Sequence, residues 1–347
     1  MLLPLPVLNF PSQTNPQSGV LRDSYGRVIR DVRISVTDRC NFRCTYCMPS
    51  EGLTWKPKSE ILSFEEILEL ASILVELGIT KIRVTGGEAL LRRGVVNLIQ
   101  DLARLKPVED LALTTNGFFL KEFTPDLVRA GLKRVTISLD SLNPQGFQSL
   151  TKVNALPRVL EAIDVAQRAG LSPVKINAVL IRGFNDGEIE DFAAFAREWG
   201  VSVRFIEYMP LDGPGEWSRA QVVPGREVYQ RIQARFPLVP LSAQDASETA
   251  RRFRFADGTP GEIGIIAPVT EPFCGACSRI RLTADGKLRT CLFSLTEYDL
   301  RAPLRRGATR QELIELIREA VRLKEAGHRI NQSDFVPPER TMSCIGG

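Results

Sequence analysis

Six short runs of β-branched and apolar residues recur along the first two thirds of the chain, with segments of helical period between them. The runs are residues 32–36 (VRISV), 81–85 (KIRVT), 111–115 (LALTT), 134–139 (RVTISL), 174–180 (VKINAVL) and 203–207 (VRFIE). Strands that alternate with helices form a parallel sheet with the helices outside it. Six units are more than a small open sheet needs and fewer than the eight of a full barrel. The repeat therefore predicts an α/β fold built on one large parallel sheet.

The segment between the first two runs carries signals for the start and the end of a helix. Ser63 and Glu66 have the spacing of a capping box, and Gly78 stands where the helix should stop. The apolar residues between them fall on one helical face, and a comparable stripe spans residues 189–199. Both segments are therefore predicted to be helices that pack on the sheet.

The strand–helix repeat ends after Met209. Residues 250–270 are predicted to form a β-hairpin around Asp257 and Gly258, and residues 310–325 a helix. We therefore expect an N-terminal extension (1–20), an α/β core (21–240) and a C-terminal region (241–347).

Composition favours a soluble protein in a reducing compartment. Hydrophobic residues make up 44% of the 347 and charged residues 25%, which is typical of a globular chain. The apolar start has no basic region and is interrupted by prolines, and no apolar run approaches the roughly 20 residues that span a bilayer. A net charge of only +4 gives little support for a nucleic-acid partner. We expect a cytoplasmic location, where clustered cysteines more often bind metal than form disulfides.

Polar residues follow four of the predicted strands, as TGGE (85–88), TTNG (114–117), SLDS (138–141) and EYMP (207–210). Ligand sites in barrel-like α/β folds lie at the carboxyl ends of the strands. These turns and the cysteine-rich loop after the first strand should therefore meet at one mouth of the sheet.

The cysteines fall into two triplets. The first is Cys40, Cys44 and Cys47, and the second is Cys274, Cys277 and Cys291. A structural zinc site takes four ligands, and His328 and Cys344 could each complete at most one site. A 4Fe-4S cluster held by three cysteines leaves one iron open to another ligand, which favours substrate chemistry over electron relay. A zinc-dependent nucleic-acid-binding protein stays open as the alternative from another class.

The motif CNFRCTYC matches the signature of radical S-adenosylmethionine (SAM) enzymes, and GGE after the second strand is the next motif of that superfamily. Further stretches resemble the GTP 3',8-cyclase family of molybdenum cofactor biosynthesis, from about residue 21 to the last residue. They are RISVTDRCNFRCTYCMP, TGGEALLRR, LTTNG, RFIEYM, FCGACSRIRLTADGKLRTCLFS and the terminal Gly346-Gly347. A radical SAM peptide-modifying enzyme is the nearest alternative. Such enzymes commonly carry more C-terminal cysteines, and the arginines after Cys277 suit a nucleotide better.

This resemblance implies an incomplete (β/α)6 barrel, with a C-terminal α+β region that closes its open side. It implies two 4Fe-4S clusters, one on the first triplet that binds SAM and one on the second triplet that binds GTP. A 5'-deoxyadenosyl radical would abstract hydrogen from ribose C3', and the carbon radical would attack guanine C8. The product would be (8S)-3',8-cyclo-7,8-dihydroguanosine 5'-triphosphate, at the first step of the pathway. An external one-electron donor, a hand-off to cyclic pyranopterin monophosphate synthase, and a monomer or homodimer without nucleic-acid or membrane partners are expected.

The resemblance also assigns site residues. The SAM contacts would be Tyr46, Gly87, Ser138 and Met209. Arg204 is a further candidate, because it interrupts an apolar strand and a buried arginine needs a partner. The GTP contacts would be Arg33, Arg83, Thr114, Lys175, Arg279, Ile280 and Arg281, and Gly346 and Gly347 would reach toward the active site. The residues themselves add a reason, because several of these basic side chains interrupt apolar strands, where a charge needs an anion. One departure is Ala89, which stands where the superfamily usually has proline after GGE.

Overall fold

The computed structural model describes residues 19–48, 55–211 and 217–346. Within these ranges twelve strands form one mixed sheet, in the order β12-β11-β10-β1-β2-β3-β4-β5-β6-β9-β8-β7. Its parallel centre comprises β1 (Asp31–Ser35), β2 (Lys81–Thr85), β3 (Asp110–Thr115), β4 (Arg134–Ser138), β5 (Lys175–Leu180) and β6 (Ser202–Glu207). The six predicted strands are thus confirmed, each to within one residue at either end.

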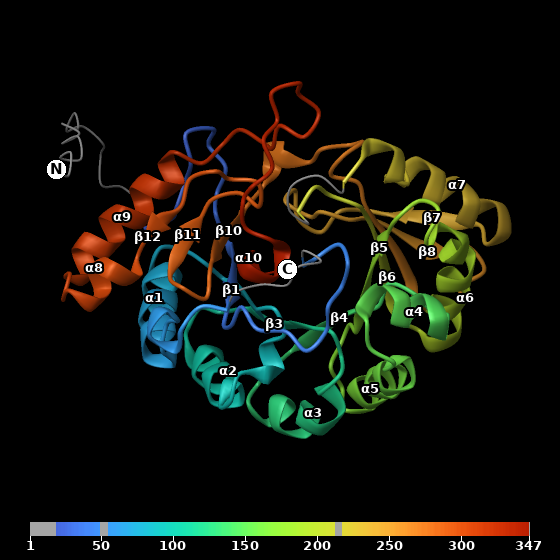
Figure 1. Ribbon diagram of the computed structural model, residues 1–347, viewed down its shortest axis with the longest axis horizontal. Helices are drawn as coiled ribbons and strands as arrows, with labels where there is room; N and C mark the ends of the chain where they lie inside the picture. Colours follow the sequence, from blue (N-terminus) through green and yellow to red (C-terminus); the bar gives the residue numbers. More distant parts are fainter. Residues whose placement is uncertain (1–18, 49–54, 212–216, 347) are drawn as a thin grey trace.

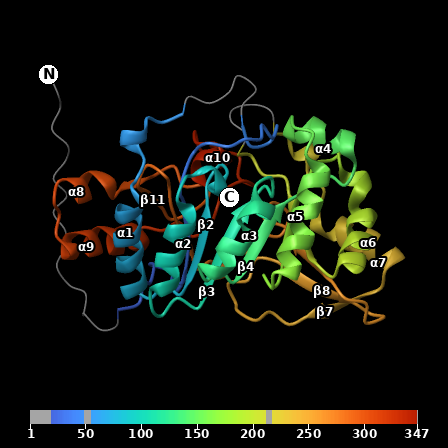
Figure 2. The ribbon, with the colours of Figure 1, turned by 90° about the horizontal axis from the view of Figure 1, so that it is seen from below.

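Helices cover the outer face of this parallel sheet (Figures 1 and 2). They are α1 (Phe64–Glu76), α2 (Val95–Arg104), α3 (Leu120–Arg129), α4 (Pro144–Thr151), α5 (Leu156–Arg168) and α6 (Ile189–Trp199). The predicted capping box is present at α1. Ser63 Oγ accepts from the Glu66 backbone N–H at 3.2 Å, and the Glu66 carboxylate accepts from the Ser63 N–H at 2.7 Å. Gly78 follows the helix with φ +96°, the left-handed conformation that favours glycine.

The two faces of the sheet differ in chemistry because successive side chains of a strand point to opposite sides. The outward residues, such as Ile34, Val84 and Ile137, are fully buried and form the main hydrophobic core with the helices. The inward residues of the same strands include Arg33 and Arg83, which line a cavity. The alternation therefore separates the folding core from a polar inner face.

The C-terminal region continues the sheet at both edges. Strand β9 (Glu262–Ile266) pairs in parallel with β6 and antiparallel with β8 (Arg251–Phe255), which pairs with β7 (Leu238–Leu241). Strand β10 (Arg279–Leu282) pairs in parallel with β1, followed by β11 (Lys287–Arg289) and β12 (Tyr298–Asp299). The predicted hairpin is confirmed as β8 and β9, with Gly258 at φ +77°.

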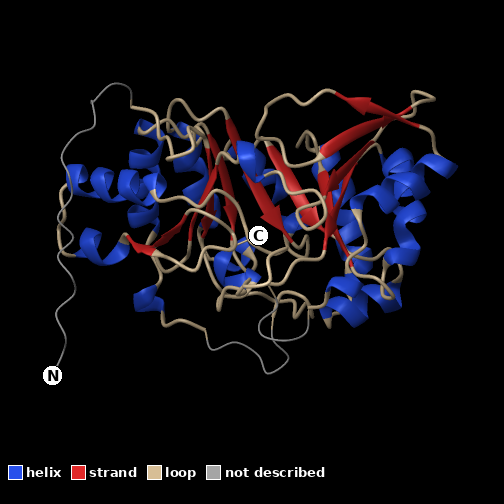
Figure 3. Cartoon of the chain, turned by 90° about the horizontal axis from the view of Figure 1, so that it is seen from above, coloured by secondary structure: helices blue, strands red, loops and turns tan. Residues whose placement is uncertain are grey.

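The sheet stays open, since it ends at β12 and β7, and loops of the C-terminal region line the inner cavity. Figure 3 shows the strands in red, with helices at both ends of the view. The remaining helices are α7 (Gly225–Arg235), α8 (Arg301–Arg305), α9 (Arg310–Arg322) and α10 (Met342–Ile345). Helix α9 confirms the predicted C-terminal helix, and α10 lies inside the curve of the sheet (Figure 1). Among the described residues, none of the helices has the length and apolar character needed to cross a membrane.

Candidate active site

A cavity opens between the inner face of the parallel sheet and the loops of the C-terminal region. From the sheet it is lined by Arg33, Arg83, Thr114, Thr136, Asn177, Arg204 and Ile206. From the C-terminal region it is lined by Phe273, Cys274, Cys277, Arg279, Arg281, Cys291, Phe293, His328 and Met342. Met209, just after β6, also borders it. Residues as far apart in the chain as Arg33 and Met342 thus contribute to one site, because β1 pairs with β10 and β6 with β9.

Arginines crowd the sheet side of this cavity, and no aspartate or glutamate is among the described residues that line it. Burial and the charge of Arg279 lower the pKa of Arg33, while burial and Arg134 lower that of Arg83 to about 9. The Nε atoms of Arg33 and Arg204 are buried and have no hydrogen-bond partner among the described residues. Buried cations that repel one another and keep unused donors favour an anionic ligand.

The second cysteine triplet borders this arginine-rich cavity. Cys274 opens a short 3₁₀ turn, and the Cys277 N–H donates to the Cys274 carbonyl at 3.1 Å. Arg279 Nη2 donates to Cys277 Sγ at 3.6 Å. Burial raises the pKa of Cys277, but the charges of Arg279 and Lys324 outweigh it and bring the value to about 7. A thiol with a pKa near 7 is partly ionised at neutral pH, and the thiolate is the form that binds iron.

The first triplet lies in the loop that follows the carboxyl end of β1. The Cys47 N–H donates to the Cys44 carbonyl at 3.0 Å, and Asn116 Nδ2 donates to Cys40 Sγ at 3.7 Å. Burial raises the pKa of Cys40 to about 11, and burial and the neighbouring thiols also raise the pKa of Cys44 and Cys47. Three thiols gathered in one half-buried loop need positive charge before they ionise together, which a bound iron centre would supply.

The GGE segment after β2 packs against the start of the cysteine loop and hydrogen-bonds to its backbone. The Gly87 N–H donates to the Thr37 carbonyl at 2.8 Å, and a Cβ at Gly87 would lie 2.5 Å from the Arg39 carbonyl oxygen. Glu88 is 1% exposed, and its carboxylate accepts from Thr115 Oγ1 and from the backbone N–H groups of residues 90 and 116 at 2.7 to 2.9 Å. Ala89, in the usual proline position, is fully buried at the start of a 3₁₀ turn. Because a Cβ at position 87 would collide with the Arg39 carbonyl oxygen, the packing of the backbone by itself requires glycine there.

The other predicted SAM contacts lie at the mouth of the sheet. Tyr46 donates its hydroxyl to Asp140 Oδ2 at 2.6 Å, which ties the cysteine loop to the turn after β4. Ser138 ends β4, beside Asn177 of β5 in the register of the sheet. Arg204 and Met209 line the cavity. The structure thus places Tyr46 and Ser138 near the carboxyl end of β4, whereas Arg204 and Met209 line the cavity that the second triplet borders.

Two predicted GTP contacts lie away from the cavity surface. Ile280 has its side chain fully buried in the main core, because it alternates with Arg279 and Arg281 along β10. Lys175 is on the inward face of β5 beside Thr136, two residues before Asn177, which lines the cavity. Burial and the charges of Arg204, Arg134 and Arg83 lower its pKa to about 7.

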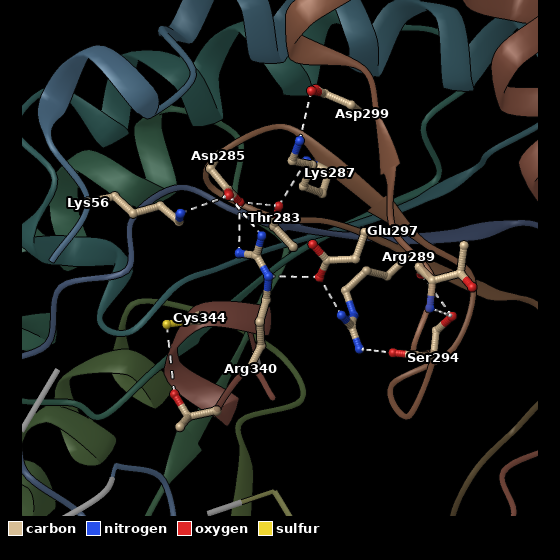
Figure 4. A network of polar contacts seen from close by, with 12 residues as sticks. Lys56, Thr283, Asp285, Lys287, Arg289, Ser294, Glu297, Asp299, Arg340 and Cys344 are labelled. Carbon is tan, nitrogen blue, oxygen red and sulfur yellow. Dashed lines mark hydrogen bonds and ion pairs between the residues drawn. The ribbon is translucent and has the colours of Figure 1, made fainter. Parts of the chain in front are cut away.

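The C-terminal tail reaches the inner face of the sheet. Arg281 Nη1 donates to the Gly346 carbonyl oxygen, and a Cβ at Gly346 would lie 2.9 Å from Thr85 and 3.0 Å from Ser35. Figure 4 shows how the tail is held: both terminal nitrogens of Arg340 contact the Asp285 carboxylate, at 3.0 and 2.9 Å, and its Nε contacts Glu297 at 2.7 Å. Gly347 lies outside the described residues.

Several lining residues were not predicted. Asn177 interrupts the apolar run 174–180 just as Lys175 does, so its polarity was a usable signal. Phe273, Phe293 and His328 come from loops without a periodic pattern. Only the pairing of β10 with β1 brings these loops to the cavity, and no local sequence signal encodes that contact.

Comparisons with known proteins place this site in a class. The family model of the Radical SAM superfamily matches residues 34–196, and that of Molybdenum Cofactor Synthesis C matches residues 201–330. The crystal structure of Streptococcus suis SuiB bound to precursor peptide SuiA has a TM-score of 0.59 at 15% identity, covering 92% of this chain and 77% of that chain. Its SAM-bound form has a TM-score of 0.57 at 15% identity, covering 92% and 76%. At this identity the likeness shows the fold alone. Together with the family model it defines the class of the fold as radical SAM.

Curated relatives narrow the class to one family. The GTP 3',8-cyclase of Streptomyces coelicolor is 46% identical over 329 residues, covering 94% of this chain and 96% of the relative. That of Thermodesulfovibrio yellowstonii is 47% identical, covering 94% and 100%, and that of Acidothermus cellulolyticus is 48% identical, covering 87% and 84%. This chain belongs to the GTP 3',8-cyclase family of molybdenum cofactor biosynthesis. SAM and an iron–sulfur cluster are the cofactors that the radical SAM family implies.

Proposed function

We propose that this chain converts GTP to (8S)-3',8-cyclo-7,8-dihydroguanosine 5'-triphosphate, with GTP bound in the arginine-lined cavity. The observation that carries the proposal is that Arg33, Arg83 and Arg281 line the same cavity as the second cysteine triplet. One end of the cavity thus suits a polyanion, and the other end offers thiolates that can hold a metal centre.

The proposed SAM site is the first triplet together with Tyr46, Gly87, Ser138, Arg204 and Met209. When bound there, the iron–sulfur cluster and SAM supply the 5'-deoxyadenosyl radical that abstracts hydrogen from ribose C3'. The chain's own part is to hold the loop still. Gly87 and Glu88 pack and hydrogen-bond against residues 37–39, and Tyr46 is tethered to Asp140. Substrate and radical must stay within a few tenths of an ångström of reacting geometry, which rigid supports favour.

The proposed triphosphate site consists of Arg33, Arg83, Arg279, Arg281 and Lys175, with Thr114 beside Arg83 at 3.2 Å. Charged hydrogen bonds contribute roughly 1.5 to 3 kcal/mol each, and micromolar affinity needs about 8 kcal/mol. Four or five such groups are therefore enough for micromolar binding, even though their contributions do not add in full. The core position of Ile280 leaves only its backbone for a ligand contact.

The second triplet is proposed to hold a second 4Fe-4S cluster whose open iron meets the guanine. Cys274, Cys277 and Cys291 all line the cavity, and Arg279 and Lys324 bring positive charge to them. Among the described residues, no three Cys, His, Asp or Glu side chains converge on a single metal ion. A four-iron cluster would not need three side chains around one ion, because each thiolate would bind a different iron.

Gly346 and Gly347 are proposed to complete the active site. Gly346 offers its carbonyl to Arg281 at the cavity, which supports this role for the tail. We further propose the division into residues 1–20, 21–240 and 241–347, a cytoplasmic location, an external one-electron donor and a hand-off to cyclic pyranopterin monophosphate synthase. All seven cysteines are free, as a reducing compartment requires.

Anaerobic turnover of the reconstituted, reduced chain with GTP and SAM tests the function. We expect 5'-deoxyadenosine and a cyclised nucleotide in equal amounts, whereas cleavage of SAM with GTP unchanged would contradict the proposal. Cys274→Ser should leave reductive SAM cleavage in place and impair GTP turnover. Equal loss of both activities in this variant would show that the second triplet is structural.

A further inference from the structure

Lys324 is a buried lysine just after α9, only 3% exposed, and the proposed function does not account for its own contacts. Its Nζ donates to the Arg279 carbonyl at 3.1 Å and to the Thr290 carbonyl. Arg279 lies two residues after Cys277, and Thr290 directly precedes Cys291. The ammonium therefore joins the two backbone segments that carry these cysteines.

The charge of Lys324 is not paired with a carboxylate in the part of the chain that the structure describes. Its two partners are carbonyl oxygens, and the neighbouring carboxylate of Glu325 accepts from Thr290 Oγ1 at 2.7 Å and from Ser294 Oγ instead. A buried lysine is costly unless an anion compensates it. Its two carbonyl partners stand beside Cys277 and Cys291 in the chain, so negative charge on the second cysteine triplet would compensate the ammonium.

The other cations near the triplet have different tasks. Arg33 and Arg281 lie on the cavity surface. Arg279 lines the cavity, and Arg27 is paired with Asp23 at 2.5 Å while it donates to the carbonyls of Cys274 and Ala326. Lys324 is thus the buried cation of this group that has neither a carboxylate nor a place on the cavity surface.

We propose that Lys324 is the fixed counter-charge of the second metal centre, which stabilises its reduced form and so raises its reduction potential. The inference rests on the second cluster of the proposed function. Adding one electron to a thiolate-held cluster increases its negative charge, and a nearby buried cation favours that state. Lys324 is a positioning and tuning residue, because it acts through the cysteines rather than on GTP.

Redox titration of three variants separates charge from hydrogen bonding. Lys324→Arg keeps the charge and the donors, Lys324→Gln keeps a neutral donor, and Lys324→Met removes both. The full-length chain is reconstituted anaerobically and titrated with dithionite, and the electron paramagnetic resonance signal that does not respond to SAM is followed. Iron and sulfide are counted in each sample. Lys287→Gln is the matched control, since it removes a lysine that is paired with Asp299 at 2.7 Å and partly exposed.

We expect Lys324→Gln and Lys324→Met to lower the reduction equilibrium constant at least about tenfold, which is 59 mV for one electron. Lys324→Arg and Lys287→Gln should keep the wild-type potential. A wild-type reduction potential in Lys324→Gln, with full iron content, would overturn the inference. Lys324 would then only hold the two backbone segments together through its hydrogen bonds. If Lys324→Met does not load iron, the reduction potential of Lys324→Gln still tests the inference. About four irons rather than eight in the wild type would instead refute the second cluster itself, and the inference with it.

Discussion

The carbonyl oxygen of Gly346 accepts a hydrogen bond from Arg281, a cavity arginine 65 positions earlier in the chain. Arg281 sits on β10 beside Arg33 of β1, so the tail meets the arginine cluster directly. The contact ties the end of the chain to the site proposed for GTP. Anything that releases the tail should therefore also alter how the cavity receives its ligand.

Arg340→Ala tests how the tail is held. The Arg340 guanidinium bridges Asp285, whose side chain is 4% exposed, and Glu297. Removing one partner of a largely buried ion pair costs about 3 to 5 kcal/mol. We expect amide hydrogen exchange of residues 342–346 to rise at least tenfold and GTP turnover to fall. The control is Arg329→Ala, because the Arg329–Asp334 pair is 59% exposed on both sides. Unchanged exchange in Arg340→Ala would show that Arg281 alone seats the tail.

Arg33→Met should weaken GTP binding while making the free protein more stable. Its Nε is buried without a partner, and burial and Arg279 lower its pKa. Replacing an unpaired buried cation by an apolar side chain relieves that cost, whereas a lost charged hydrogen bond costs about 1.5 to 3 kcal/mol of binding, roughly 10- to 150-fold in Kd. Calorimetry with GTP and a thermal melt measure the two effects. A lower melting temperature together with unchanged affinity would assign Arg33 a purely structural role.

Lys175 should make GTP binding depend on pH. In the free protein its pKa is lowered to about 7 by burial and by Arg204, Arg134 and Arg83, with Glu262 opposing them. At pH 8 the amine is therefore mostly neutral, and a bound triphosphate should restore its charge. We expect uptake of up to one proton on binding at pH 8, and affinity that falls as pH rises above about 7.

Calorimetric titration at pH 8 in two buffers of different ionisation enthalpy measures that proton. Lys175→Met should abolish the uptake. If the observed enthalpy is the same in both buffers for the wild type, Lys175 does not contact the triphosphate.

Gly87→Ala should disable the first cysteine site selectively. The added methyl group would lie 2.5 Å from the Arg39 carbonyl oxygen and 2.7 Å from that of Asp38, so the loop must shift. Such overpacking costs about 1 to 3 kcal/mol and displaces backbone. We predict loss of SAM cleavage by at least tenfold with the second triplet still loaded with iron. Gly187→Ala is the control, since a Cβ there meets no atom within 4 Å. Wild-type SAM cleavage in Gly87→Ala would show that the loop accommodates the methyl group without loss of activity.

Local patterns in the sequence were sufficient for most of the core. The six parallel strands, the α1 capping box and the β8–β9 hairpin follow from period and turn residues, which act over a few positions. The inward arginines of β1 and β2 were also predictable, because a charge that interrupts an apolar strand must face away from the helices. The spacing of the cysteines was enough to indicate metal chemistry.

Local sequence information thus specifies which strands and helices form and which face of the sheet is polar, and it identifies two cysteine triplets as candidate metal sites. The tertiary structure was needed to show that β9 and β10 extend the parallel sheet at its two edges, and that the sheet stays open. It was also needed to bring Arg340 to Asp285, and Lys324 to the backbone beside the second triplet. The difference lies in the range of the interactions. Propensity, capping and alternation act between near neighbours, whereas pairing across hundreds of residues depends on how the whole surface of each element packs.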